Sequence, residues 1–213
     1  MKNLKCIIFD CDGVLVDSET IGIRILLSMA NEHGFEMTHD QGIKQYSGRR
    51  FTDCLAEIEN AIQKKLPDNF EEEFRRRSYE AYKSDLQPIK GAKEFVESLT
   101  IAFCVASSGP VEKIRHNLIT TGFIEKFENK IFSAYQIQRW KPDPGIFLYA
   151  ASEMGFSVNE CIVIEDSIAG VVAAVNGGFK VFGYANENSA QDLENEGATV
   201  FYDYQQLAEF LQN

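Results

Sequence analysis

The spacing of apolar side chains along the sequence differs between the first third of the chain and the rest. From about residue 18 to residue 86, apolar side chains recur every three or four positions, which is the spacing of one helix face. Beyond this region, short apolar runs of the strand type alternate with helical segments. The strand-like runs are 6–9, ahead of the helical region, and 101–106, 130–133, 161–164, 180–184 and 199–202 after it.

This alternation predicts an α/β fold in which helices cover both faces of a parallel sheet. The first strand belongs to the same sheet, so the helical region interrupts it. We therefore predict a doubly wound parallel-sheet core domain formed by residues 1–16 and 88–213. Residues 17–87 are predicted to form a helical cap domain, inserted after the first strand.

Polar residues in the helical region predict where its helices begin. Thr38 and Gln41 have the spacing of a capping box, in which each side chain satisfies a free backbone N–H group at the helix start. Thr52 is predicted to cap the following helix, and Asp68 with Glu71 the one after it.

The successive arginines Arg75, Arg76 and Arg77 could form an anion-binding patch. Each, however, follows a glutamate four positions earlier in the chain, from Glu71 to Glu73. Glutamate–arginine pairs at this spacing stabilise exposed helices. We therefore interpret the triplet as a solvated helix face.

The composition and net charge of the chain limit the classes of binding partner and the compartment that we expect for it. The net charge of −11 argues against nucleic acids and anionic membrane surfaces, and no apolar stretch is long enough to span a bilayer. The five cysteines are scattered and form no CxxC pair, which favours a reducing compartment over a disulfide framework or zinc site. We expect a cytoplasmic protein without nucleic-acid or membrane partners, and we take it to be a monomer.

The first strand runs into two acids one residue apart, Asp10 and Asp12, followed by Gly13. Alternate side chains of an extended chain point to the same side, so the two carboxylates can lie together. Carboxylates that close repel each other unless a cation lies between them or one holds a proton. The pair suits a metal-dependent nucleophile with an acid/base partner, although a solvated acidic turn would look the same in sequence.

Further polar groups occur at later strand exits and in the connecting loops. They are Ser107, Ser108 and Gly109 after one strand, Lys141 before a helix, and Glu165 and Asp166 after another strand. Each alone could be a turn residue, a surface lysine or a helix cap. Ligands of open α/β sheets bind beyond the carboxyl ends of the strands, and together these groups predict one shared site there.

In this order, these motifs resemble those of the haloacid dehalogenase superfamily, which has a Rossmann-like core. The four matching segments are Asp10-Cys11-Asp12-Gly13, Ser107, Lys141 and Glu165-Asp166. The helical insertion is similar to the cap of the β-phosphoglucomutase-like branch. Residues 132–144, with 108–110, look especially like bacterial 6-phosphogluconate phosphatase-type sugar phosphatases.

The resemblance implies hydrolysis of small phosphate monoesters, with Asp10 as the nucleophile that forms an aspartyl phosphate. Asp12 would protonate the leaving oxygen and then activate water. It also implies Mg²⁺ bound by Asp10, the backbone carbonyl of Asp12, and Asp166. Glu165 would bind this ion through water or support its ligands.

The same resemblance assigns the groups that hold the phosphate. Lys141 would neutralise charge on Asp10 and on the phosphoryl oxygens. Ser107, with nearby backbone N–H groups, would bind these oxygens, and Ser108 and Gly109 are expected to face the substrate.

Residues 47–52 resemble the substrate-facing cap loop of the branch. Arg49 or Arg50 could bind a sugar carboxylate or distal oxygens, or both could simply lie on an exposed turn. A phosphosugar mutase would use the same core groups and remains an alternative. A phospho-receiver signalling module also places acids, a hydroxyl and a lysine on such a sheet, but the cap of about 70 residues argues against it.

Overall fold

The computed structural model describes residues 3–47, 49 and 51–212, and within them one parallel sheet has the strand order β3-β2-β1-β4-β5-β6. Its strands are β1 (Cys6–Phe9), β2 (Ala102–Ser107), β3 (Ile131–Ser133), β4 (Cys161–Glu165), β5 (Lys180–Tyr184) and β6 (Thr199–Phe201). The order reverses beside β1, which pairs with β2 on one side and β4 on the other. The predicted α/β doubly wound fold is confirmed.

Every residue of β1 and β4 is buried, because helices cover both faces of the sheet. Ile7 and Phe9 point into one apolar cluster, and Cys6 and Ile8 point into the other. Residues of α5 (Ala92–Ser98), α6 (Val111–Thr120), α7 (Ile124–Phe127) and α12 (Tyr204–Gln212) belong to the first cluster. The second cluster includes residues of α8 (Ala134–Ile137), α9 (Gly145–Glu153), α10 (Ile168–Asn176), α11 (Ala190–Asn195) and the short 3₁₀ helix η1 (Val158–Glu160).

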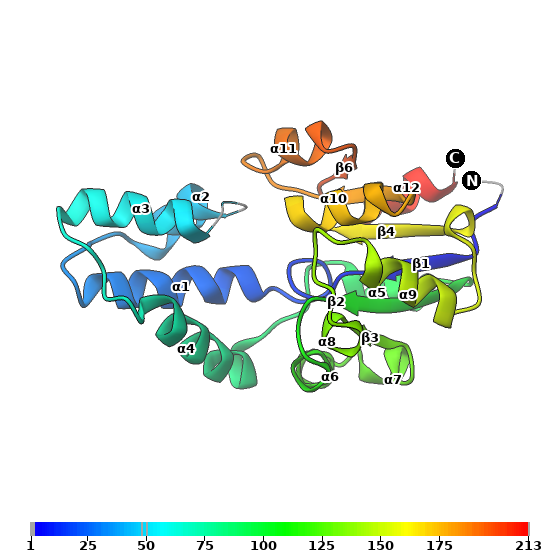
Figure 1. Cartoon of the computed structure of the whole chain (residues 1–213), viewed down its shortest axis with the longest axis horizontal. Helices are drawn as coiled ribbons and strands as arrows, with labels where there is room; N and C mark the ends of the chain where they lie inside the picture. Colours follow the sequence, from blue (N-terminus) through cyan, green and yellow to red (C-terminus); the bar gives the residue numbers. More distant parts are fainter. Residues whose placement is uncertain (1–2, 48, 50, 213) are drawn as a thin grey trace.

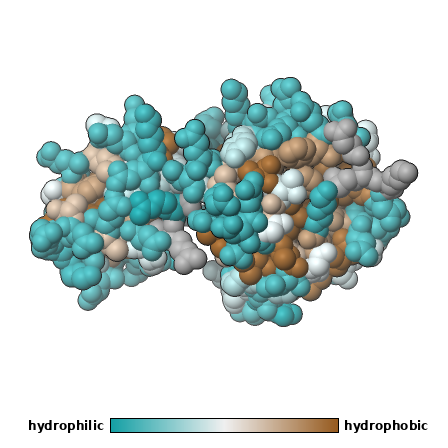
Figure 2. All heavy atoms as spheres, turned by 90° about the horizontal axis from the view of Figure 1, so that it is seen from above, coloured by the Kyte–Doolittle hydropathy of each residue, from teal (hydrophilic) through white to brown (hydrophobic). Residues whose placement is uncertain are grey.

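The first four of the five described helices between β1 and β2 lie apart from the sheet, on the left of Figure 1. They are α1 (Ser18–Asn31), α2 (His39–Tyr46), α3 (Phe51–Ile62) and α4 (Phe70–Asp85). They enclose an apolar cluster of their own, with Ile58 fully buried in it. Seen from above, the molecule accordingly has two lobes (Figure 2).

The chain passes between the two lobes twice, and the two passages lie side by side. The Asp17 backbone N–H donates to the Gln87 carbonyl at 2.8 Å, and the Ile89 N–H donates to the Leu15 carbonyl at 2.9 Å. These hydrogen bonds tie the two passages together. The lobes also meet away from them, where Asn188 Nδ2 donates to the Lys44 carbonyl at 3.0 Å. None of the helices within the described ranges is both long and apolar enough to cross a membrane.

The predicted helix starts were partly right. The capping box of Thr38 and Gln41 is present at the start of α2. The start at Thr52 was wrong, because α3 already begins at Phe51. The cap at Asp68 was also wrong: α4 begins at Phe70, after Asn69, and without a capping side chain. A turn from Phe70 N–H to the Pro67 carbonyl leads into α4 instead.

The paired charges of α4 also differ in part from the prediction. Arg75 bonds to Glu71 and Arg77 to Glu73, as predicted. Arg76 bonds to Glu73 at 2.8 Å rather than to Glu72, because residues three apart are also neighbours on a helix.

Candidate active site

The predicted site residues converge at the carboxyl ends of the central strands. In the sheet register Phe9 lies opposite both Val105 and Ile164, so the residues that follow these three leave the sheet at the same edge. One cavity of about 640 Å³ lies at this edge. It is lined by all eight predicted core residues: Asp10, Asp12, Ser107, Ser108, Gly109, Lys141, Glu165 and Asp166.

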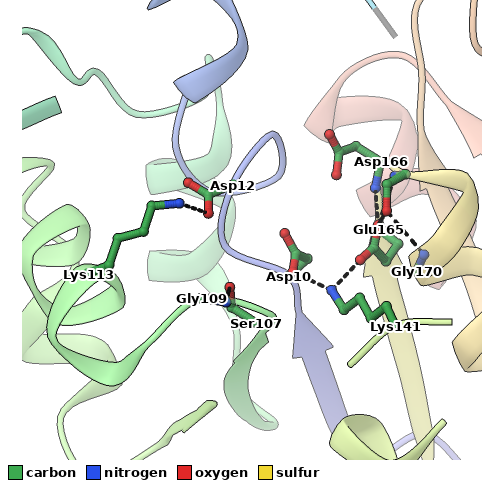
Figure 3. A network of polar contacts seen from close by, with 10 residues as sticks. Asp10, Asp12, Ser107, Gly109, Lys113, Lys141, Glu165, Asp166 and Gly170 are labelled. Carbon is green, nitrogen blue, oxygen red and sulfur yellow. Dashed lines mark hydrogen bonds and ion pairs between the residues drawn. The ribbon is translucent and has the colours of Figure 1, made fainter. Parts of the chain in front are cut away.

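Lys141 links two of the acids. Its ammonium group donates to Asp10 Oδ1 and to Glu165 Oε1, as Figure 3 shows. The side chain is only 6% exposed. Burial disfavours its charge, but the two carboxylates outweigh burial and raise the pKa of Lys141. Lys141 therefore stays protonated beside Asp10.

The acids nevertheless outnumber this cation. Burial, together with the charges of Glu165 and Asp12, raises the pKa of Asp10 to about 7 despite Lys141. Burial and the same glutamate raise the pKa of Asp166 well above its usual range. Such shifts mean that these carboxylates share more negative charge than their surroundings offset.

A divalent cation would offset this excess. Asp10, Glu165 and Asp166 each offer a carboxylate oxygen, and these oxygens lie within 4.8 Å of one another. Hard oxygen ligands are those that Mg²⁺ prefers. The cluster therefore fits a hard divalent ion such as Mg²⁺.

Within this cluster Glu165 is already occupied by hydrogen bonds. Its Oε2 accepts from the backbone N–H groups of Asp166 and Ser167 at 2.9 and 2.8 Å, and from the Ser167 hydroxyl at 2.9 Å. Its other oxygen faces Lys141. Glu165 thus fixes the direction of the loop that carries Asp166, which leaves Asp10 and Asp166 as the better placed metal ligands.

Two glycines make room for these acids. Gly13 has φ +78°, and a Cβ atom there would lie 1.9 Å from Asp166 Oδ2. A Cβ atom on Gly170 would lie 1.9 Å from the carboxyl carbon of Glu165. Both positions require glycine for space, and Gly13 also requires it for its backbone conformation.

Asp12 is held apart from this cluster by a second lysine. Lys113 Nζ lies 2.6 Å from Asp12 Oδ2, and Asn117 Nδ2 donates to Asp12 Oδ1 at 3.2 Å. Both partners come from α6, one turn apart, and Figure 3 shows Lys113 reaching Asp12 on the side away from Lys141. The two acids of the first motif therefore have separate ammonium partners, an arrangement that sequence analysis missed.

The loop after β2 completes the floor of the cavity. Ser107 is 2% exposed, and its hydroxyl accepts from the Gly109 N–H at 3.1 Å. The Ser133 hydroxyl, also missed, donates to the Gly109 carbonyl at 2.6 Å and so fixes the loop from β3. Ser108 and Gly109 line the cavity as predicted.

Of the two arginines predicted to bind substrate from the cap, the structure describes only Arg49. Arg49 lies in the cap, with Nη1 2.8 Å from Glu57 Oε2, and lines two neighbouring cavities but not the catalytic one. Arg50 lies outside the described residues. The cap instead reaches the catalytic cavity with residues of α1 and α4, including Arg75, which sequence analysis had assigned to a solvated face.

The chain is similar to several known proteins. Residues 7–184 match the sequence model of the haloacid dehalogenase-like hydrolases, and the chain belongs to this family. It is 31% identical over 211 residues to 6-phosphogluconate phosphatase of Escherichia coli K12, covering 98% of this chain and 95% of that protein. It is 26% identical to a phosphorylated carbohydrates phosphatase of Thermotoga maritima, over 92% of this chain and 93% of that protein.

A solved structure is similar over nearly the whole chain. A haloacid dehalogenase-family hydrolase from Deinococcus radiodurans, with bound phosphate and sodium, superimposes with a TM-score of 0.83. It is 26% identical, and the match covers 98% of this chain and 95% of that one. Together with the family match, these relatives define the chain as a phosphatase.

Proposed function

We propose that the protein is a Mg²⁺-dependent phosphatase that hydrolyses sugar or sugar-acid phosphates, such as 6-phosphogluconate, through an aspartyl phosphate on Asp10. One observation carries the proposal: Asp10 is buried at the cavity floor, bonded to Lys141 and adjacent to Asp166. The names of the relatives support a sugar-phosphate substrate.

In the first half of the reaction, Asp10 attacks phosphorus and the bond to the leaving oxygen breaks. Lys141 offsets charge on Asp10 and on the phosphoryl oxygens. Mg²⁺ held by Asp10, the Asp12 carbonyl and Asp166 would reduce the repulsion between carboxylate and phosphate. Ser107 and the backbone N–H groups of its loop bind the phosphoryl oxygens.

Asp12 moves the protons. It gives a proton to the leaving oxygen and then takes one from the water that hydrolyses the aspartyl phosphate. In this structure Lys113 and Asn117 donate to its two carboxylate oxygens. Asp12 must therefore release one of these contacts and take up a proton before it acts as the acid. An acid here is needed for an ester oxygen, which leaves poorly without a proton.

We also propose that residues 17–87 act as the cap that excludes water during turnover. The hydrogen-bonded double passage near Asp17 and Gln87 supports a hinge there. The predictions of a monomer and of a cytoplasmic location are retained; the five unpaired cysteines suit a reducing compartment. A contact of Arg49 or Arg50 with distal substrate oxygens stays a prediction.

The test is release of orthophosphate across a panel of phosphorylated sugars, sugar acids and nucleotides. The Asp10→Asn variant is expected to lose turnover by at least about 1,000-fold, because an amide is not a nucleophile for phosphorus. Near-normal activity of this variant would overturn the assignment. Phosphate release that requires no bisphosphate activator separates the phosphatase from the mutase alternative.

A further inference from the structure

Helix α4 turns one face toward the catalytic cavity. Arg75, Ser78, Tyr79 and Tyr82 line the cavity, at the spacing of one helix face. The C-terminal part of this face packs against the core helix α6: the Lys113 ammonium lies 5.6 Å from the centroid of the Tyr82 ring. The N-terminal part, with Arg75 and Ser78, is left over the cavity.

Arg75 lies where two cavities adjoin. It lines the catalytic cavity and also a cavity of about 330 Å³ within the cap. Of the cap residues that the structure describes, Arg75 is the cationic one at the catalytic cavity, and Arg49 lines only the neighbouring cavities. A substrate with its phosphate at Asp10 that extends into the cap would therefore pass Arg75.

The charge balance of the cavity requires such a group for an acidic substrate. Five carboxylates line it: Asp10, Asp12, Glu19, Glu165 and Asp166. The ammonium groups of Lys141 and Lys113 are engaged by these acids. A substrate carboxylate would be repelled here unless a further cation received it.

Arg75 can exchange its present partner at little cost. Its Nε and Nη2 atoms bond to Glu71 Oε1, in a pair whose side chains are 75% and 48% exposed. Exposed ion pairs contribute little, because water already screens both charges. A substrate carboxylate that replaces Glu71 would accept two parallel hydrogen bonds from the guanidinium.

We propose that Arg75 recognises the end of the substrate remote from the phosphate, and that it selects an open-chain sugar acid phosphate by binding its carboxylate. This assignment rests on the proposed phosphatase function and names the substrate class of the same site.

The test compares 6-phosphogluconate with sorbitol 6-phosphate, which carries a CH₂OH group in place of the carboxylate. Arg75→Ala is expected to lower kcat/KM for 6-phosphogluconate about 10- to 100-fold, mainly through KM, the effect of a lost charge-assisted hydrogen bond. For sorbitol 6-phosphate the change stays within about threefold.

Arg76→Ala is the matched control. Arg76 lies on the same helix and bonds to Glu73, but does not line the catalytic cavity, so this variant is expected to change neither substrate. An equal effect of Arg75→Ala on both substrates, no effect on either, or an equal selective loss in Arg76→Ala would overturn the proposal. Circular dichroism of each variant checks that folding is intact.

A binding experiment tests the inference independently of turnover. In the Asp10→Asn background with Mg²⁺, calorimetry is expected to show tighter binding of 6-phosphogluconate than of sorbitol 6-phosphate, and loss of this preference when Arg75→Ala is added. Equal binding of the two compounds with Arg75 in place would overturn it. If the unmodified protein releases no phosphate but the preference is present, the proposed reaction fails while the recognition role of Arg75 stands.

Discussion

Lys141 shows how one side chain sets the chemistry of this site. Its ammonium group lies between Asp10 and Glu165 and is almost fully buried. A buried cation between two buried acids stabilises one negative charge fully, and the second only in part. The remaining charge is the reason that a divalent ion fits beside Asp10 and Asp166.

Gly13 provides a test of that metal site. We expect Gly13→Ala to displace the Asp166 carboxylate, because the new Cβ atom would lie 1.9 Å from its Oδ2. The concentration of Mg²⁺ needed for half-maximal activity should rise about 10-fold or more, as for a disturbed metal ligand. It is measured by titrating Mg²⁺ in an assay of phosphate release.

Gly34→Ala is the control for this substitution. Gly34 also has a left-handed backbone, with φ +94°, but a Cβ atom there would meet nothing within 4 Å. Both variants should lose about 1 kcal/mol of stability from backbone strain. Equal Mg²⁺ requirements in the two variants would contradict the close contact between Gly13 and Asp166.

Among the helices, local sequence signals and tertiary packing have separate effects. The capping box of α2 depends only on residues within one stretch of four, and it is present as predicted. The start of α4 followed the Pro67 turn instead of a capping side chain, so Asp68 gave a false signal. The face of α4 that meets the cavity could not be predicted, because it depends on how the cap packs against α6.

The two threonines predicted as caps give a matched pair of variants. Thr38→Ala is expected to lower the free energy of unfolding by about 1 kcal/mol, because it removes the acceptor for the Gln41 N–H. Thr52→Ala should change it by less than about 0.5 kcal/mol, since Thr52 lies inside the first turn of α3. Urea unfolding of both variants measures the difference; a larger loss in Thr52→Ala would contradict the helix start at Phe51.

Over the whole molecule, the clustered acids couple metal binding, pH and stability. In the metal-free protein the pKa of Asp10 is raised from 3.8 to about 7, so between these values the folded chain holds a proton that the unfolded chain has released. The contribution of Asp10 to the free energy of unfolding must therefore fall as pH rises through this window. Glu73 and Glu160, whose pKa values are lowered from 4.5 to about 2, make stability rise with pH below about pH 4.5, so the fall caused by Asp10 is expected between about pH 5 and pH 7.

Mg²⁺ should reverse this trend, because it competes with the same protons. We expect the rise in Tm caused by a fixed concentration of Mg²⁺ to be small at pH 5 and to grow toward pH 8, while the Tm of the metal-free protein falls. Thermal unfolding at matched ionic strength, with NaCl replacing MgCl₂, measures both effects. A Mg²⁺-induced shift that is independent of pH would contradict the raised pKa of Asp10.

The sequence alone determined the order of strands and helices and the edge at which the motifs meet. Buried parallel strands read as continuous apolar runs, and their carboxyl ends lie at one edge, so Asp10, Ser107 and Glu165 were bound to converge. Other residues of the site lie far along the chain from the side chains that they contact. Lys113 reaches Asp12 from 101 residues away, and Arg75 comes from another lobe. Only tertiary packing decides such contacts, because the orientation of one helix against another leaves no local periodic pattern.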